Sequence, residues 1–383
     1  MATNTFDYII AGGGMAGLSL GFYLDESSLK GKKVLIIDRE KKNKNDHTWC
    51  FWEKGKSAFE EIVFRSWNQF WFHGTRRFSE LLELENYQYK MIRAIDFYEF
   101  VISKLETNSN FTFLQADILE VENDSVKTDK GEFFADKFIF DSWTRKKYDD
   151  PTYHNLWQHF LGWEIETSQD VFKKDEPTLF DFRVEQKDEC RFIYILPVSS
   201  KKALIEFTIF SDNLIEKEEY EANLKKYISE ILQVETYKIN ETESGIIPMS
   251  DEPHEEFPNA KIIRIGTAGG YVKPSTGYSF KRTQKRLQNL VESLEKTNSI
   301  KNSKLKIQNW KLYLDSVLLN VLHSKKHPAD EVFTSLFREN KTSQVLKFLD
   351  EETSIKEDLH IMKTVPLVSF TKAAIEEVFK KLK

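Results

Sequence analysis

The first forty residues show the apolar pattern of a strand, a helix and a second strand. One apolar run covers residues 6–11, and apolar side chains recur over residues 18–24. A second short run covers residues 34–37 and ends at Asp38. Short apolar runs separated by a helical stretch are typical of buried parallel strands joined by a crossover helix. The pattern therefore predicts a βαβ unit over residues 5–40.

Further along, the same kind of pattern predicts the rest of this sheet. Residues 95–105 have a helical period, and residues 137–140 form a buried run that ends at Asp141. Residues 111–114 and 118–121 have strand length and composition. Residues 45–80 are rich in aromatic side chains but keep no period, so we expect them to be irregular.

The middle of the chain has a different pattern. Apolar positions alternate or run at strand length over residues 155–250, which favours a separate antiparallel sheet. Residues 216–232 read as a charged amphipathic helix. The strands expected in this part cover residues 157–166, 178–184, 191–196 and 203–210.

The last part of the chain is predicted to be helical. Residues 258–290 return to the first sheet, and the helical period starts at about residue 301. No internal repeat or low-complexity linker interrupts the sequence. One apolar stripe at helical spacing consists of Leu312, Val317, Leu318, Val321 and Leu322.

Composition narrows the class of protein. With 383 residues, 40% hydrophobic and 30% charged, the chain is expected to fold into two or three globular units. The net charge of −6 argues against a nucleic-acid partner. We expect a cytoplasmic location for three reasons. The chain has two cysteines, it leaves no room for a signal peptide before the first strand, and it has no apolar run long enough to span a membrane. The 14% aromatic content fits either a well-packed core or a ring-lined apolar site.

The loop after the first strand carries a nucleotide-binding motif. Residues 12–17 read GGGMAG, which is G-x-G-x-x-G at a strand-to-helix junction. Gly12 allows the tight turn, Gly14 lets a pyrophosphate approach, and Gly17 lets the helix pack on the strand. Asp38 follows Gly17 by 21 positions, at the end of the second strand, where it can accept from a ribose hydroxyl. The motif in this context predicts dinucleotide binding.

A second glycine-rich segment follows another short β-rich run. Residues 262–280 read IIRIGTAGGYVKPSTGYSF and lead into a basic, helix-competent stretch. Small residues allow close approach of backbone to a ligand, and a helix start offers free N–H groups. This geometry suits the negatively polarised end of a flavin ring. The residues expected to bind the cofactor here are Gly266, Ala268, Gly269, Gly270, Thr276, Gly277 and Tyr278.

These motifs and five others together resemble the lycopene cyclase family of bacterial and plant type, nearly end to end. Two departures stand out. Trp143 occupies a position where the family usually has Arg, and Leu204-Ile205-Glu206-Phe207-Thr208 replaces the family's Leu-Glu-Glu-Thr motif, so that Glu206 alone carries its acid. The other matching segments are NDHTWCFWE (45–53), FDSW (140–143), QHFLGWEIET (158–167), LPVSSKKALIEFTIFS (196–211) and ESGIIPMSD (243–251).

Pattern and resemblance together predict an α/β fold. It combines a Rossmann-like FAD/NAD(P)-binding fold with an antiparallel-sheet substrate domain and a helical C-terminal part. The expected boundaries are residues 1–50, 90–150 and 255–300 for a discontinuous FAD-binding domain, residues 51–89 and 151–254 for the substrate domain, and residues 301–383 for the helical region.

The resemblance implies a lycopene β-cyclase that works with reduced FAD, with NAD(P)H as the reductant. Such an enzyme would protonate a ψ-end of lycopene, close the ring and release a proton, converting lycopene through γ-carotene to β-carotene without net redox change. The reduced flavin would either stabilise the intermediate cation or take part in proton transfer. The ring type, the number of rings, the base for the last proton and the oligomeric state stay open.

Glu206 is the expected catalytic acid. Its apolar strand would raise its pKa by desolvation and keep it protonated. An alternative is a solvent-facing position, because Leu204, Glu206 and Thr208 share one side of the strand by period two. Cation–π contacts of about 0.5–2 kcal/mol each would come from rings of the substrate site. The rings expected there are Trp49, Phe51, Trp52, Trp157, Phe160 and Trp163.

Several other positions have a binding and a structural interpretation. Met15, Ala16, Arg39 and Asp141 are expected in the cofactor shell, with helix capping as the alternative for Asp141. Asp251 fits either a flavin neighbour or a turn. The His323 and His327 pair lacks a third ligand, so no metal site is expected.

The substrate that the family implies is an apolar bilayer solute, so the enzyme is expected to dock peripherally on the membrane surface. Basic pairs at 281–282, 285–286, 325–326 and 380–381 are candidate lipid contacts, with solvated helix faces as the alternative. The C-terminal helices are expected to supply a tunnel wall and a lipid-facing lip through Phe333, Leu336, Phe337, Val345, Phe348 and Leu349.

Two other functions fit the same motifs. One is a flavin-dependent reductase or monooxygenase that acts on another isoprenoid lipid. Thr267 argues against it, because hydroxylases of this fold usually have Asp after the glycine. The other is a flavin- or carotenoid-binding protein without catalysis.

Overall fold

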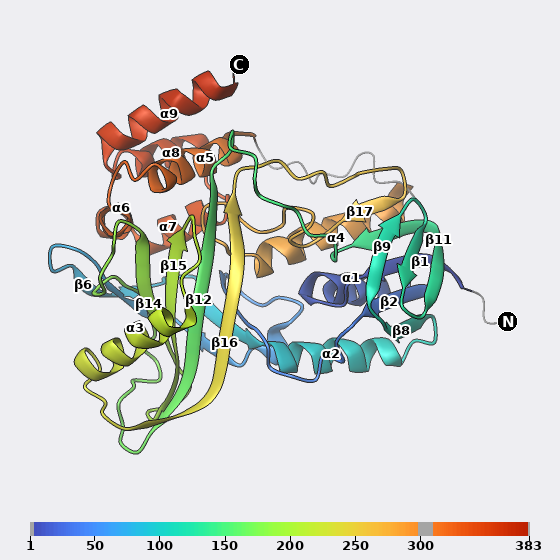
Figure 1. Ribbon diagram of the computed structural model, residues 1–383, viewed down its shortest axis with the longest axis horizontal. Coiled ribbons are helices and arrows are strands. Elements are labelled where there is room, and N and C mark those ends of the chain that lie inside the picture. Colours follow the sequence, from blue (N-terminus) through green and yellow to red (C-terminus); the bar gives the residue numbers. More distant parts are fainter. Residues whose placement is uncertain (1–3, 298–308, 382–383) are drawn as a thin grey trace.

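The computed structural model describes residues 4–297 and 309–381 and shows an α/β fold (Figure 1). Its first sheet, sheet A, has the strand order β8-β2-β1-β11-β10-β9, and β17 pairs with β11. Strands β1, β2, β8, β11 and β17 run parallel, whereas β9 and β10 form an antiparallel extension. The strands are β1 (Thr5–Ala11), β2 (Val34–Asp38), β8 (Phe111–Gln115), β9 (Ile118–Glu122), β10 (Ser125–Thr128), β11 (Gly131–Asp141) and β17 (Ile262–Arg264).

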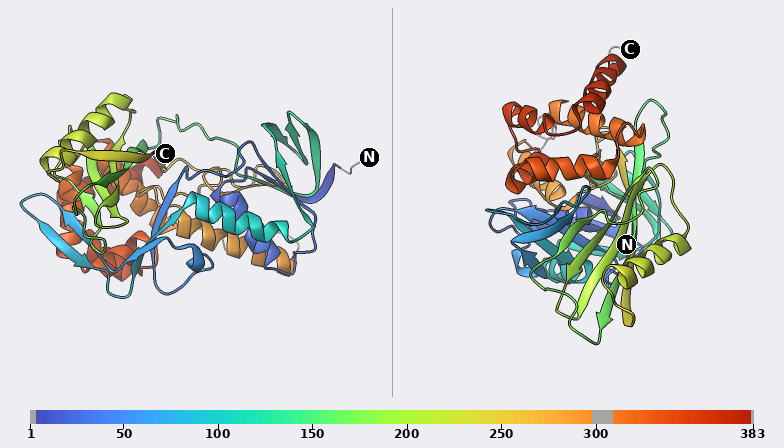
Figure 2. Two further views of the ribbon diagram at one scale, coloured as in Figure 1. Left: turned by 90° about the horizontal axis from the view of Figure 1, so that it is seen from below. Right: turned by 90° about the vertical axis from the view of Figure 1, so that its left-hand side faces the viewer.

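Sheet A is covered on one face by α1 (Met15–Asp25), α2 (Ala94–Glu106) and α4 (Phe280–Thr297), which lie side by side (Figure 2). Apolar side chains of β1 and β2 are fully buried, as the apolar runs in the sequence predicted. Those on one face of the sheet pack with helix residues, and those on the other face pack with residues of β9, β10 and β11. This arrangement is the Rossmann-like unit expected from the sequence.

The second large sheet, sheet C, has the order β16-β12-β15-β14-β13-β5-β6. Its central strands are antiparallel, as predicted, although β13 and β5 pair in parallel. Helix α3 (Lys217–Glu230) packs on one face through its own apolar cluster. The strands are β5 (Gln69–His73), β6 (Ser79–Glu83), β12 (Asn155–Thr167), β13 (Thr178–Asp181), β14 (Cys190–Pro197), β15 (Lys202–Ser211) and β16 (Tyr237–Ser250).

A small sheet, sheet B, joins the two parts. It consists of β3 (Thr48–Glu53), β7 (Gln88–Arg93) and β4 (Arg65–Trp67), and η1 (Glu60–Ile62) precedes β4. The expectation that residues 45–80 are irregular is therefore wrong, since β3, β4, β5 and β6 occupy this stretch. The expected domain boundaries at 50/51 and 89/90 pass through β3 and β7.

The C-terminal helices lie against the face of sheet C that α3 leaves free (Figures 1 and 2). They contact the sheet through the side chains of α6, so that strand and helix residues share one core. None of the helices within residues 4–297 and 309–381 is long and apolar enough to cross a bilayer. The helices are α5 (Asn309–His323), α6 (Ala329–Glu339), α7 (Thr342–Leu349), α8 (Ile355–Met362) and α9 (Leu367–Lys381).

The residues expected to form a lipid-facing lip lie in the interior instead. Phe333, Leu336, Phe337 and Val345 are buried, and Phe348 and Leu349 pack against the same core. That expectation is corrected by the structure, because sheet C offers an apolar face large enough to cover these side chains. The predicted stripe on α5 is divided between two clusters, with Val317 and Val321 packed against α9.

Candidate functional site

The loop between β1 and α1 forms an open cradle at the edge of sheet A. Gly12 has φ +103°, a conformation that glycine adopts readily, and its N–H donates to the Ile37 carbonyl oxygen at 2.9 Å. A Cβ built on Gly14 would meet no atom within 4 Å of the described structure. No side-chain cap is formed at this end of α1, which begins at Met15. The first N–H groups of α1 therefore face open space, as a bound pyrophosphate requires.

Close packing between two glycine segments fixes this cradle. A Cβ at Gly17 would lie 2.0 Å from the carbonyl oxygen of Gly12, so the helix presses directly on the turn. Gly266, with φ +61°, approaches the first turn of α1, since a Cβ there would lie 2.8 Å from the Cβ of Ala16. The structure thus brings the two glycine-rich motifs of the sequence together.

Asp38 lies beside the cradle at the end of β2. Its carboxylate accepts the N–H of Gly13 at 2.7 Å and the N–H of Glu40 at 2.8 Å. Lys42 Nζ lies 3.1 Å from the same carboxylate. The neighbouring Arg39 is exposed and lies 3.6 Å from the Glu40 carboxylate. Asp38 therefore faces the predicted nucleotide site, whereas Arg39 is directed to the surface.

Asp141 shapes the cradle from the neighbouring strand. Its buried carboxylate accepts the N–H groups of Trp143 and Thr144 at 3.0 and 2.8 Å, which stabilises the turn after β11. In the same turn, the Ser142 hydroxyl donates to the carbonyl oxygen of Gly12 at 2.9 Å. One carboxylate oxygen is thus taken up by backbone donors, and Arg264 Nε lies 3.8 Å from the other. Asp141 supports the loop in place of a helix cap.

The second glycine-rich segment continues from β17 toward sheet C. A Cβ at Gly269 would lie 2.2 Å from the carbonyl oxygen of Arg264. The His254 ring lies against Gly270, and one of its nitrogens lies 3.2 Å from the carbonyl oxygen of Ala268. Gly277 has φ +73°, and a Cβ there would meet the Gln158 side chain of β12 at 2.1 Å. Thr276 Oγ1 accepts the N–H of Tyr278 at 3.4 Å, just before α4 begins. The segment therefore connects the cradle to sheet C.

Glu206 stands in a row of residues across four strands of sheet C. Tyr194 pairs with Glu206, Glu206 pairs with Gly162, and Gly162 pairs with Glu243. Residues paired in this way share one face of a sheet. Leu204 and Thr208 lie on the same face by the period of two, as the sequence indicated. This face is turned away from α3 and toward the tyrosines and the C-terminal helices.

The Glu206 carboxyl has few neighbours that could stabilise its charge. Thr208 donates its hydroxyl hydrogen to Glu206 at 2.5 Å. Burial, together with the nearby Glu243 carboxylate, raises the pKa of Glu206 to about 8 against the opposing effect of the Thr208 hydrogen bond. Glu206 therefore holds its proton at neutral pH, while its side chain keeps partial contact with open space.

Three tyrosines and a cysteine form a cluster beside Glu206. The Tyr278 hydroxyl lies 3.3 Å from that of Tyr89 and 3.5 Å from that of Tyr194. Burial raises the pKa of the Cys50 thiol beside them, so this group is neutral as well. The ring of Trp52 packs edge-on against Tyr278, with centroids 4.5 Å apart. Neutral, polarisable groups thus surround Glu206.

Glu243 is a second carboxyl in this region, and the sequence interpretation gave it no role. It accepts the N–H of Thr48 at 2.8 Å and the Thr48 hydroxyl hydrogen at 2.7 Å. Burial raises the pKa of Glu243, and the Thr48 bonds act in the opposite direction. The only sequence signal was its place in the matching segment at 243–251, because β16 is polar and shows no strand pattern.

The predicted substrate-site aromatics divide between several locations. Trp52 and Phe160 lie near Glu206, and the Phe160 ring covers Gly245 on the neighbouring strand. Trp163 points to the opposite face of sheet C and packs in the α3 core. The remaining rings also lie apart from Glu206: Trp49 and Phe51 pack against Phe280 of the cofactor domain, and Trp157 packs against Tyr148.

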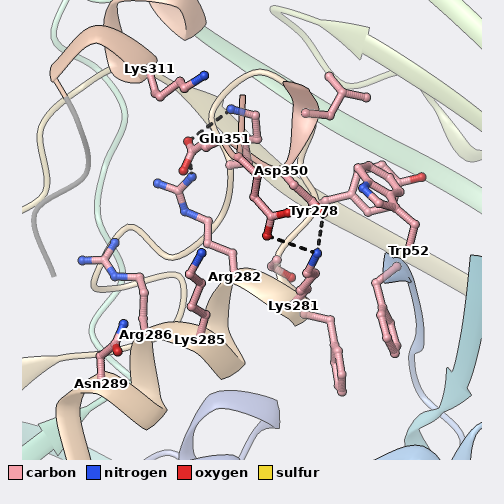
Figure 3. A pocket seen from close by; sticks show the side chains of 16 residues that line it. Trp52, Tyr278, Lys281, Arg282, Lys285, Arg286, Asn289, Lys311, Asp350 and Glu351 are labelled. Atoms are coloured by element: carbon pink, nitrogen blue, oxygen red, sulfur yellow. Dashed lines mark hydrogen bonds and ion pairs between the residues drawn. The ribbon is translucent and has the colours of Figure 1, made fainter. Parts of the chain in front are cut away.

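A surface cavity of about 210 Å³ lies next to Tyr278 and Trp52 (Figure 3). Its basic side comes from the first turns of α4, and its acidic side from residues 350–352. Lys281 pairs with Asp350, and Arg282 pairs with Glu351 at 2.6 Å. The predicted basic patch at 281–282 is therefore largely neutralised within the protein.

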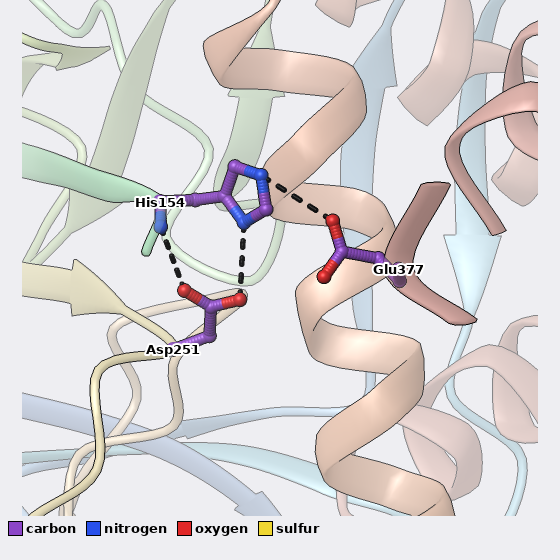
Figure 4. Close-up of side chains that lie close together, drawn as sticks. All are labelled: His154, Asp251 and Glu377. Atoms are coloured by element: carbon purple, nitrogen blue, oxygen red, sulfur yellow. Dashed lines mark hydrogen bonds and ion pairs between the residues drawn. The ribbon is translucent and has the colours of Figure 1, made fainter. Parts of the chain in front are cut away.

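His154, Asp251 and Glu377 form a hydrogen-bonded group between sheet C and α9 (Figure 4). Asp251 accepts the N–H of His154 at 2.7 Å and contacts its Nδ1 at 3.0 Å. His154 Nε2 lies 3.4 Å from Glu377, which also accepts from Asn320 at 2.7 Å. Both ring nitrogens of His154 thus already have partners in the chain. Asp251 anchors the end of β16, which favours the structural interpretation given above.

Comparison with known proteins agrees with this architecture. The sequence profile described as lycopene cyclase protein matches residues 7–375. A lycopene beta-cyclase of Pantoea ananas is 24% identical over 281 residues, which cover 72% of this chain and 71% of that protein. A chloroplastic neoxanthin synthase of Solanum lycopersicum is 24% identical and is covered over 64% of its length by 80% of this chain.

Solved structures share the fold at low identity. A flavoprotein/dehydrogenase from Cytophaga hutchinsonii aligns with a TM-score of 0.63 and 12% identity over 98% of this chain and all of that one. A geranylgeranyl bacteriochlorophyll reductase-like protein from Thermoplasma acidophilum aligns with a TM-score of 0.59 and 11% identity, covering 96% of this chain and 98% of that one.

The glycines of the cradle give a testable separation of roles. Replacing Gly17 with Ala should lower the free energy of unfolding by about 1–3 kcal/mol, because its Cβ would overlap the Gly12 carbonyl. Replacing Gly14 with Ala should leave stability unchanged within about 0.5 kcal/mol and weaken nucleotide binding, since its Cβ enters the open space over α1. Chemical denaturation and FAD titration measure the two effects. Equal losses of stability in both variants would contradict this assignment.

Proposed function

The chain belongs to the lycopene cyclase protein family, and on this premise we propose that it is a lycopene β-cyclase. The observation that carries the proposal is the position of the Glu206 carboxyl, which is hydrogen-bonded to Thr208 among neutral aromatic groups and has a pKa raised to about 8 by burial. Acid-initiated cyclisation of an alkene needs such a group at neutral pH. The substrate would be lycopene, and the products would be γ-carotene and then β-carotene.

The proposed reaction is an isomerisation. The O–H bond of Glu206 breaks as its proton adds to the terminal double bond of a ψ-end, which leaves a tertiary cation. The π electrons of a neighbouring double bond then form the new C–C ring bond, and a proton leaves the carbon next to the resulting cation. Protons in and out balance, so no oxidant or reductant is consumed.

The residues around Glu206 suit each of these demands. Thr208 donates to one carboxyl oxygen and so fixes the orientation of the group. Trp52, Tyr278 and Phe160 are the rings whose faces could attract a cation, with about 0.5–2 kcal/mol for each well-placed ring. The buried, uncharged surroundings strengthen every such electrostatic contact.

FAD is the cofactor that the cradle fits best. A pyrophosphate would fit the open space over Gly14 and the uncapped start of α1, and a ribose would fit beside the carboxylate of Asp38. The segment from Gly266 to Tyr278 leads from there toward Glu206. When bound in its reduced form, with NAD(P)H as the proposed reductant, FAD would supply negative charge close to the developing cation. The protein residues in this scheme hold the cofactor and exclude water.

The outer face of α8 and α9 is the proposed membrane contact. Val368 and Phe379 are 86% and 62% exposed, and exposed lysines surround them at 356, 363 and 372. An apolar stripe with a basic rim fits the boundary of an anionic bilayer, from which lycopene must be drawn. The exposed apolar side chains are Ile355, Leu359, Leu367, Val368, Ile375, Val378 and Phe379.

Replacing Glu206 with Gln should abolish cyclisation. We expect a loss of about 10²–10⁴-fold, because the N–H protons of the amide are far too weakly acidic to be transferred to an alkene. The assay is pigment chromatography from a lycopene-accumulating bacterial host. Glu164→Gln is the matched control, since Glu164 lies one row away on the same face and pairs with Lys202. Conversion by Glu206→Gln would refute the role of this residue, and unchanged lycopene with folded, flavin-loaded wild type would favour the reductase or monooxygenase.

The pH dependence should follow the pKa of Glu206. The initial rate should fall as pH rises through about 8, because the proton donor is lost. Because the pKa of Glu206 is higher in the folded protein than the ordinary value of 4.5, its protonation stabilises the fold. This contribution to the free energy of unfolding is complete below pH 4.5 and is lost as pH rises through about 8. Chemical denaturation of wild type and Glu206→Gln at about pH 6 and about pH 9 measures this contribution to the free energy of unfolding. An equal pH dependence in both proteins would contradict it.

The membrane contact predicts a localised effect on lipid binding. The double change Val368→Ser and Phe379→Ser should weaken binding to vesicles with anionic lipid by about tenfold or more, since burial of each side chain contributes about 1.5–3 kcal/mol. Leu119→Ser is the control, because Leu119 is 63% exposed on β9 of the cofactor domain. Co-sedimentation with vesicles measures binding. An equal loss in the control would exclude a specific role for α9.

A further inference from the structure

We propose that Glu243 is the base that removes the final proton, opposite Glu206 across Gly162. This inference rests on the proposed cyclase function and adds a residue to its mechanism. The pairing register is its main support, because Gly162 of β12 is paired with Glu206 of β15 on one side and with Glu243 of β16 on the other. The two carboxyl-bearing residues therefore share one face, two strand spacings or roughly 10 Å apart at their backbones.

Residue 162 contributes no side chain to the space between the two acids. A Cβ built on Gly162 would lie 3.2 Å from Leu204 Cδ1 and 3.5 Å from the Cβ of Glu206, so the Leu204 side chain reaches over this position. A larger residue at 162 would press on both Leu204 and Glu206. With glycine, a shift of the Leu204 side chain would let a hydrocarbon end group lie against the sheet with one carboxyl on each side.

The two carboxyls differ in their hydrogen-bond partners in the way that an acid and a base require. Glu206 accepts one hydroxyl donor, from Thr208. Glu243 accepts two donors from Thr48, one of them a backbone N–H. Donors favour the ionised form of a carboxyl, so Glu243 is the better anion of the two. His47 adds a further favourable interaction with that anion, and Asp46 opposes it.

The proposed step balances protons and charge. After Glu206 has given up its proton, two carboxylates flank the ring cation and stabilise it from both sides. The C–H bond next to the cationic carbon breaks, its electrons form the ring double bond, and the proton goes to an oxygen of Glu243. Return of that proton to Glu206 after product release resets the pair for the next end group.

The test compares Glu243→Gln with wild type in vesicles that contain lycopene, with the full-length, FAD-loaded protein in D₂O. We expect cyclisation to fall about 10²-fold or more, as for loss of a general base. We also expect the lycopene recovered from the variant to carry deuterium at its ends, or the remaining rings to have a shifted double bond, since protonation by Glu206 still occurs. Glu206→Gln should give neither signal.

Gly162→Ala provides a second variant that leaves both acids in place. Leu204 can move to admit one methyl group, so this variant should fold and still cyclise more slowly, by about tenfold. Wild-type rate and product in Glu243→Gln would overturn the inference and leave the proposed function intact. Loss of cyclisation with neither deuterium nor a shifted double bond would also overturn it, and would assign Glu243 to holding Thr48. If the wild-type protein leaves lycopene unchanged, both the proposed cyclase function and the proposed role of Glu243 are refuted.

Discussion

The whole site depends on the pairing register of three strands. Because side chains alternate along a strand, a slip of one residue between β12 and β15 would turn Glu206 away from the tyrosines and into the α3 core. The apolar residues of the α3 face, such as Ile205 and Phe207, make that slip costly, since they would lose their buried positions. The packing of α3 on one face of sheet C therefore fixes the chemistry on the other face.

A second set of contacts sets the position of the cofactor domain relative to this sheet. Thr48 of β3 donates to Glu243 of β16, and Trp52 of β3 packs against Tyr278. Gly277 lies directly against the Gln158 side chain of β12. Sheet B and the second glycine segment thus connect the nucleotide cradle to the row of acids.

The sequence predicted the parts of this architecture that are set by local rules. The apolar runs, the glycine motif and Asp38 located β1, α1 and β2, and the alternation of residues 203–210 located β15 and the shared side of Glu206 and Thr208. It did not predict β3 to β6, because aromatic residues buried on both faces leave no period. The sequence placed Trp163 on the wrong face of the sheet and gave no role to Glu243, and both errors have the same cause. Which face a residue occupies, and what stands opposite it, depends on pairing between strands far apart in the chain.

The location of α9 has a practical consequence for attaching other proteins. The beginning of β1 lies at the right-hand end of the molecule, far from the end of α9 at its top (Figure 1). A fluorescent protein fused ahead of β1 would extend away from the apolar face of α8 and α9. The same protein fused behind α9 would stand next to that face and hold it off a bilayer, so imaging of the cellular distribution calls for the amino-terminal fusion.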